Sequence, residues 1–158
     1  LKNTLAAGIS QTFPNVEIIA GVATAGIPHG ALVAEALNLP FIYVRSEAKK
    51  HGLSNQIEGK LPEGAKVMVI EDLVSTGGSS LTAVNALRNA GAQVEGMAAL
   101  FTYAFDAADD AFKNADCKLY TLSDYPSLIQ YALANNIIPK ETESLLGEWR
   151  KNPGAWMQ

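Results

Sequence analysis

The sequence predicts an α/β fold in which a parallel β-sheet is flanked by helices. Segments typical of strands alternate with segments typical of helices along the chain, and this alternation indicates a parallel sheet. The run Val67–Ile70 is entirely apolar, as expected for a strand buried on both faces. The 158 residues are enough for a substantial core, and we expect residues 1–158 to form a single domain.

The first elements follow from apolar spacing and from one proline. Leu1, Leu5 and Ile9 recur at every fourth position, which predicts an amphipathic helix. Pro28 suits the first position of a second helix. The elements expected in this part of the chain are a helix over 1–12, a strand over 16–22, a helix from Pro28 to about Leu37 and a strand over 41–44.

The rest of the chain starts with a loop and continues the alternation. Residues 46–61 are polar and show no clear period, so we expect a long loop. Ser79 is the expected N-cap of the next helix, and Gly91 stands where a glycine commonly ends one. The expected elements after the loop are a strand over 66–71, a helix over 79–90, a strand over 94–103, a helix over 107–114, a strand over 118–121, and helices over 126–135 and 141–150.

The segment between the strand and helix on either side of Gly77 carries the most informative chemistry. Glu71 and Asp72 are expected at the C-terminal tip of the strand. Gly77 and Gly78 then allow backbone N–H groups to approach an anion, and the following helix adds the positive end of its dipole. Because carboxylates repel phosphate, the two acids are expected to bind sugar hydroxyls or a divalent metal. The arrangement suits a phosphorylated sugar, and an ordinary acidic turn is the alternative.

Two further loops follow predicted strands and should open at the same edge of the sheet, where ligands bind in such folds. The small residues of 23–26 expose N–H groups that suit a pyrophosphate, although a structural turn explains them equally well. The loop 45–52 carries the basic side chains Arg45, Lys49, Lys50 and His51. Such cations could close over a polyanion and shield a reaction from water, and a solvated surface loop is the alternative.

Composition excludes several classes of function. The net charge of −4 provides no basic field, so we expect no nucleic-acid partner. The single cysteine, Cys117, excludes an internal disulfide and suits the cytoplasm, and we expect it to be a small buried residue rather than a nucleophile. No apolar run approaches the roughly 20 residues that cross a bilayer, so no membrane partner is expected.

The same segments resemble a known family. The stretch Glu71-Asp72-Leu73-Val74-Ser75-Thr76-Gly77-Gly78-Ser79 resembles the phosphoribosyl pyrophosphate (PRPP) motif of the type I phosphoribosyltransferases. It is not a Walker loop, because no Gly-Lys-Ser/Thr follows. Together with residues 21–59 it is similar to the orotate phosphoribosyltransferases, most of all to the form found in Gram-positive bacteria. The resemblance extends through residues 148–153.

This resemblance implies a type I phosphoribosyltransferase fold and a reaction of pyrimidine biosynthesis. Orotate and PRPP would give orotidine 5′-monophosphate and pyrophosphate. The residues that match PRPP-binding positions of the family are Thr24, Ala25, Arg45, Lys49, His51, Glu71, Asp72, Leu73, Val74, Ser75, Thr76, Gly77, Gly78 and Ser79.

The resemblance implies that the basic loop carries the catalytic residues. Arg45, Lys49 and His51 match residues that contact the pyrophosphate, and Lys49 matches the lysine credited with catalysis. His51 is either a ligand of the pyrophosphate or its proton donor. In this family the loop reaches into the neighbouring subunit, so a homodimer that shares the loop Arg45–Gly52 is implied.

The acidic strand tip and the turn are implied to hold the rest of the substrate. Glu71 and Asp72 match the acids that bind the ribose hydroxyls, Ser75 matches a contact to orotate, and Thr76–Ser79 cradle the 5′-phosphate. The implied cofactor is Mg²⁺, bound mainly through PRPP, and Asp72 remains open as a metal ligand.

The chain also departs from the family pattern. Ser46 stands where many members carry a lysine. Thr102-Tyr103 stands where many carry an Asp-Arg pair whose arginine binds orotate, so that contact is not expected here. In the family an N-terminal segment forms a hood over orotate, and because the chain opens at Leu1 on a helical pattern we expect it to lack this segment. We therefore expect the 158-residue chain to bind PRPP and to turn it over poorly.

Two other functions remain compatible with the sequence. A purine phosphoribosyltransferase would use the same PRPP loops with another base. A non-catalytic regulator would bind PRPP without turnover, but the presence of Lys49, His51, Glu71 and Asp72 favours catalysis.

Overall fold

One sheet organises the part of the chain that this computed structural model describes, residues 1–45 and 56–156. The order of its six strands is β3-β2-β1-β4-β5-β6. Every neighbouring pair is parallel except β2 and β3. The predicted parallel α/β fold is confirmed. The strands are β1 Ile18–Val22, β2 Phe41–Val44, β3 Ile57–Glu58, β4 Lys66–Val74, β5 Gln93–Thr102 and β6 Leu119–Asp124.

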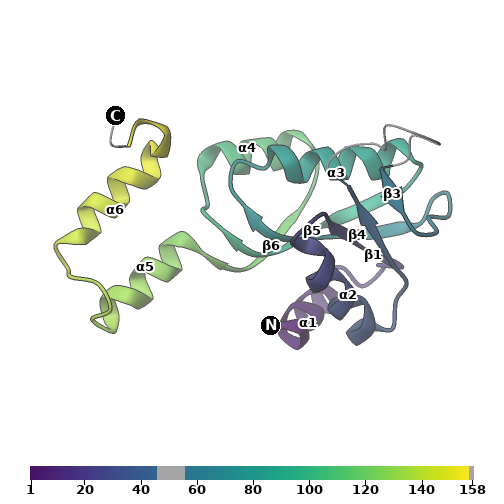
Figure 1. The fold of residues 1–158 in the computed structure, drawn as a ribbon, viewed down its shortest axis with the longest axis horizontal. Helices are drawn as coiled ribbons and strands as arrows, with labels where there is room; N and C mark the ends of the chain where they lie inside the picture. The colour runs from purple at the N-terminus through teal and green to yellow at the C-terminus, as the bar shows by residue number, and fades with distance from the viewer. Residues whose placement is uncertain (46–55, 157–158) are drawn as a thin grey trace.

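Helices cover both faces of the sheet (Figure 1). α1 and α2 lie on one face, α3 and α4 on the other, and α5 and α6 lie at one end of the molecule beyond β6. Of the helices in the described ranges, none is long and apolar enough to span a bilayer. The helices are α1 Lys2–Thr12, α2 Gly26–Leu37, α3 Gly78–Asn89, α4 Asp106–Asn114, α5 Tyr125–Ala134 and α6 Thr142–Lys151, and a 3-10 turn, η1, follows at Pro153–Ala155.

The central strand β4 is buried on both faces, as its apolar run predicts. Val67 and Val69 belong to the core cluster that includes Leu87 of α3. Met68 and Ile70 alternate with them and belong to the cluster under α1 and α2. Successive side chains of a strand point to opposite faces, so four consecutive apolar residues fill both halves of the core.

Several predicted boundaries are wrong by a few residues, and those of β4 and α2 are nearest the crevice at the carboxyl ends of the strands. β4 continues to Val74 instead of ending at Glu71, because its last residues still pair with β5. α2 begins at Gly26, so Pro28 is its third residue rather than its first. A proline is tolerated there because the first four N–H groups of a helix have no helical partner in any case.

Three further expectations need correction. The N-cap of α3 is Gly77 rather than Ser79, and α3 begins at Gly78. Within the expected loop 46–61, the short strand β3 pairs antiparallel with β2 at the edge of the sheet. β6 runs to Asp124, three residues beyond the predicted end at Thr121, and it pairs with β5 over this length.

The topology creates one crevice at the carboxyl ends of the strands. After β1 the chain moves outward to β2 and β3, and it then returns to β4 on the other side of β1 and continues to β5 and β6. The strand order therefore reverses between β1 and β4. In open α/β sheets, ligands bind outside the carboxyl ends at such a switch point.

The C-terminal helix is fixed to the end of β5 by aromatic and polar contacts. The ring of Tyr103 lies 5.6 Å from that of Trp149 in α6 and 5.3 Å from that of Phe105. The Arg150 guanidinium donates from Nε to the carbonyl of Tyr103 at 3.1 Å, and from Nη2 to the carbonyl of Ala104. Tyr103 therefore packs against the C-terminal helix.

We expect Arg150→Ala to loosen α6 from the sheet, because two carbonyls lose a charged donor. The expected loss of stability is about 1–3 kcal/mol. The emission of Trp149 should shift to longer wavelength as its indole leaves the aromatic cluster. Thermal unfolding and tryptophan fluorescence measure both effects, with Lys151→Ala, at the exposed next residue, as the control. Equal spectra for the two variants would contradict this arrangement.

Candidate active site

A cleft of about 360 Å³ lies at the switch point between β1 and β4. Its walls are the loop that leads from β1 into α2 and the end of β4 with the turn into α3. Two of the three loops expected to share a site are thus brought together. The lining residues are Val22, Ala23, Thr24, Ala25, Glu71, Asp72, Leu73, Ser75, Thr76, Gly77, Gly78 and Ser79.

The two acids border the cleft because β4 extends past the end of β1. The register of β1 with β4 runs only to Gly21 opposite Ile70, whereas β5 accompanies β4 to Val74. Glu71 and Asp72 therefore lie inside β4, not at its tip as predicted, on a stretch that is covered by a strand on one edge only. The two carboxylates are close enough that the Asp72 side chain acts directly on that of Glu71.

Glu71 is held by two internal donors. The Ser80 hydroxyl donates to its Oε2 at 3.2 Å, and the backbone N–H of Asp72 donates to its Oε1 at 3.1 Å. Only 7% of Glu71 is exposed. Burial, together with the neighbouring Asp72 side chain, raises the pKa of Glu71 from 4.5 to about 7.

Two helices begin at this cleft. Neither Ala25, the N-cap of α2, nor Gly77, the N-cap of α3, has a side-chain hydrogen bond among the described residues. The first N–H groups of α3 are therefore available to anions. At α2 the N–H of Ile27 donates to the carbonyl of Thr24 at 3.3 Å and Pro28 has no N–H, so of its first three residues only Gly26 can offer an N–H. Both helix dipoles favour negative charge here.

Glycines at the start of each helix make this geometry possible. An added Cβ at Gly26 would lie 2.4 Å from the carbonyl oxygen of Ile70, so only glycine lets α2 start directly against β4. Gly77 has φ +85°, which side chains disfavour, and an added Cβ there would lie 2.9 Å from the Phe112 ring.

Sequence comparison identifies the family. A profile of the phosphoribosyl transferase domain matches residues 2–132. The orotate phosphoribosyltransferase of Cytophaga hutchinsonii is 55% identical over 148 residues, which are 94% of this chain and 71% of that protein. That of Listeria innocua is 52% identical over 156 residues, which are 99% of this chain and 75% of that protein. The chain belongs to the orotate phosphoribosyltransferase family. It is therefore a transferase, and the resemblance seen in its motifs is confirmed.

Solved structures agree with this fold. The orotate phosphoribosyltransferase of Aeropyrum pernix superposes with a TM-score of 0.73 at 27% identity, covering 82% of this chain and 73% of that one. The UMP synthase of Leishmania donovani gives a TM-score of 0.75 at 24% identity. That likeness shows the fold alone; it covers 94% of this chain, which spans 32% of the length of that protein.

The remaining residues predicted for the orotate phosphoribosyltransferase site lie apart from the cleft or outside the described ranges. Lys49 and His51 fall in 46–55, outside the described residues, and so does most of the proposed shared loop. Arg45 follows β2, and its Nη1 lies 3.5 Å from Oε1 of Glu58 in β3. Arg45 is not among the residues that line the cleft.

The structure adds one residue that the sequence-based interpretation missed. Ser80 is buried in the first turn of α3 and bonds to Glu71. Ser80 follows Glu71 by nine residues on another element, and no periodic pattern in the sequence predicts contact at that spacing. Cys117, in contrast, is buried as expected, and burial raises the pKa of its thiol.

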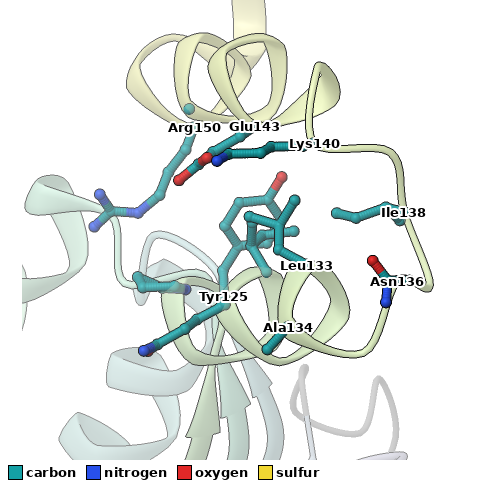
Figure 2. Close-up of a pocket in the computed structure, with 12 residues that line it drawn as sticks. Tyr125, Leu133, Ala134, Asn136, Ile138, Lys140, Glu143 and Arg150 are labelled. Carbon is teal, nitrogen blue, oxygen red and sulfur yellow. The ribbon is translucent and has the colours of Figure 1, made fainter.

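A larger cavity of about 630 Å³ lies between α5 and α6 (Figure 2). Leu133 and Ile138 contribute apolar walls, and Lys140 and Glu143 lie on the α6 side. Its walls come from α5, from α6 and from the loop between them, and none of its lining residues belongs to the segments predicted to bind PRPP. The cleft between β1 and β4 is the better candidate for the active site, despite its smaller size.

The pKa of Glu71 predicts a pH-dependent stability. Because the folded pKa is raised, the stabilising contribution is complete below about pH 4.5 and is lost as the pH rises through about 7. Glu71→Gln should therefore be about as stable as the unsubstituted protein at pH 5 and clearly more stable at pH 8. Thermal unfolding without ligand at both pH values measures the difference, with the exposed Glu63→Gln as the control. A difference in stability between Glu71→Gln and the unsubstituted protein that does not grow with pH would contradict the raised pKa of Glu71.

The turn into α3 predicts opposite effects for adjacent glycines. Gly77→Ala should destabilise the protein by at least about 1–2 kcal/mol, because of its positive φ and the Phe112 contact. Gly78→Ala should be neutral or stabilising by up to about 1 kcal/mol, because an added Cβ meets no described atom within 4 Å and alanine favours helices. Urea unfolding compares the two. Equal losses would contradict this turn geometry.

Proposed function

We propose that this orotate phosphoribosyltransferase transfers the phosphoribosyl group of PRPP to orotate within the cleft between β1 and β4. The observation that carries this proposal is the meeting of the N-termini of α2 and α3 with two carboxylates in one cleft. PRPP has a matching set of groups, namely a 5′-phosphate and a pyrophosphate joined by a ribose with free hydroxyls. The helix N-termini suit the phosphate groups, and the carboxylates suit the ribose hydroxyls as hydrogen-bond acceptors.

The N-terminus of α3 is the proposed 5′-phosphate site. Thr76–Ser79 form the turn into this helix and line the cleft. Thr24 and Ala25, before α2, are the proposed contacts for the pyrophosphate. Glu71 and Asp72 would accept hydrogen bonds from the ribose hydroxyls, while Leu73 and Val74 continue the strand that carries these acids. Ser75, which is exposed at the cleft, is the proposed contact to orotate.

The reaction needs stabilisation of charge rather than a covalent nucleophile. A ring nitrogen of orotate forms a bond to the anomeric carbon as the bond from that carbon to pyrophosphate breaks, and the proton of that nitrogen leaves to the pyrophosphate or to water. Positive charge develops on the ribose and negative charge on the leaving pyrophosphate. Lys49, Arg45 and His51 are proposed to stabilise the leaving group, and Glu71 and Asp72 lie where they can favour the cationic ribose.

Magnesium is proposed as the cofactor. No group of three or more His, Cys, Asp or Glu side chains among the described residues could hold a metal ion by itself. Mg²⁺ commonly binds through one or two carboxylates and the phosphates of its substrate, and Asp72 beside the cleft fits that mode. When bound, the ion would neutralise charge on the pyrophosphate.

The assembly and compartment are further proposals. A homodimer that shares the loop Arg45–Gly52 would bring Lys49 to the site from a second copy. Residues 1–158 are proposed to act as one phosphoribosyltransferase domain. The single cysteine fits the reducing cytoplasm as the compartment.

A product assay on the intact protein with Mg²⁺ tests the function. Orotate should support pyrophosphate release from PRPP, and adenine and hypoxanthine should not. Release with a purine alone would indicate a purine phosphoribosyltransferase. Binding of PRPP without release for any of these bases would indicate a regulator.

Lys49→Ala should lower kcat by about a hundredfold or more, since charge stabilisation of this kind contributes about 3–4 kcal/mol in enzymes. Its thermal stability should change little. Lys60→Ala, an exposed lysine beyond the loop, is the matched control and should keep its activity. An unchanged rate for Lys49→Ala would remove this residue from the catalytic role.

A further inference from the structure

Ser80 links the two elements that form one wall of the cleft, the strand β4 and the helix α3. It is the third residue of α3, and only 2% of it is exposed. Its hydroxyl donates to Oε2 of Glu71 in β4 at 3.2 Å. A buried side-chain bond therefore joins the helix that starts at the proposed phosphate site to the strand that carries the proposed ribose acceptor.

The bond fixes the orientation of the Glu71 carboxylate. Oε2 accepts from Ser80, and Oε1 accepts from the backbone N–H of Asp72. An ionised carboxylate offers about four acceptor sites, so each oxygen keeps capacity for a ligand hydroxyl. With a donor on each oxygen, the group is held before any ligand arrives.

A purely structural role explains this pair poorly. Burying a carboxylate has a cost even when it is hydrogen-bonded, and replacing both partners of such a pair by apolar groups is often neutral or stabilising. The pair lies beside the cleft, where a fixed acceptor is useful. Among the described residues, it is also the side-chain bond that connects β4 to the first turn of α3.

We propose that Ser80 is a positioning residue, which holds the Glu71 carboxylate at a fixed place relative to the N-terminus of α3. The ribose hydroxyls and the 5′-phosphate of PRPP then meet acceptors and donors that are already spaced for them. This inference rests on the proposed function, because it takes Glu71 as the ribose acceptor and Thr76–Ser79 as the phosphate site.

Steady-state kinetics of Ser80→Ala in the intact protein test the proposal. The KM for PRPP should rise about tenfold, as expected for a lost hydrogen bond to a charged group, while the KM for orotate stays within about twofold. Thr82→Ala is the matched control. It also removes a hydroxyl from α3, but that hydroxyl is exposed and bonds to the carbonyl of Gly78 at 2.9 Å. Its kinetic constants should stay close to those of the unsubstituted protein.

Two further variants separate positioning from packing. Ser80→Thr keeps the hydroxyl and should restore most of the affinity for PRPP. In a Glu71→Gln background, adding Ser80→Ala should change the KM for PRPP by less than about twofold, because Ser80 acts through Glu71. If Ser80→Ala does not fold, Ser80→Cys provides the same comparison, since a thiol fills similar space and donates weakly.

The outcomes are distinct. The positioning role would be overturned if Ser80→Ala had the same kinetic constants as Thr82→Ala. It would also be overturned if Ser80→Ala raised the KM for PRPP as much in the Glu71→Gln background as in the unsubstituted protein. If the unsubstituted protein released no pyrophosphate in the presence of orotate, the proposed function itself would fail, whatever the Ser80 variants showed.

Discussion

The site depends on the continuation of β4 past the end of β1. Up to Ile70 this strand is paired on both edges and packed on both faces, and beyond that point only β5 accompanies it. The next two residues, Glu71 and Asp72, are therefore held in place by pairing with β5, while the other edge of β4 faces the crevice. α2 and α3 both begin at this crevice, so the same few residues place carboxylates and helix N-termini together.

This placement has a cost in stability. A carboxylate buried as deeply as Glu71 is less easily ionised, and its raised pKa expresses that cost. The Ser80 hydroxyl and the Asp72 N–H offset part of it by hydrogen bonding. A sugar hydroxyl would add another donor to the same group. The unliganded site is thus arranged for a partner that brings donors, which is consistent with a ribose and inconsistent with phosphate at this point.

The features that could be predicted from the sequence are those that depend on a local pattern of residues. The apolar run before Glu71 predicted the central buried strand, and the glycine pair predicted a turn with exposed N–H groups. The predicted end of β4 was wrong because the residues of β5 that pair with its last residues are distant in the sequence, so no local pattern indicates the pairing. The N-cap was assigned to Ser79 by residue preference, whereas the positive φ of Gly77 ends the turn earlier. Ser80 was missed because its partner lies on another element.

The central claim is that the β4–α3 corner binds an activated, phosphorylated ribose. Isothermal titration of PRPP into the intact protein with Mg²⁺ tests it most directly, with a Glu71→Gln, Asp72→Asn double variant titrated in parallel. The account predicts saturable binding with one site per chain for the unsubstituted protein and binding at least about tenfold weaker for the variant, as expected when hydrogen bonds to charged groups are lost. Absence of binding to the unsubstituted protein, or equal affinity for both proteins, would contradict it.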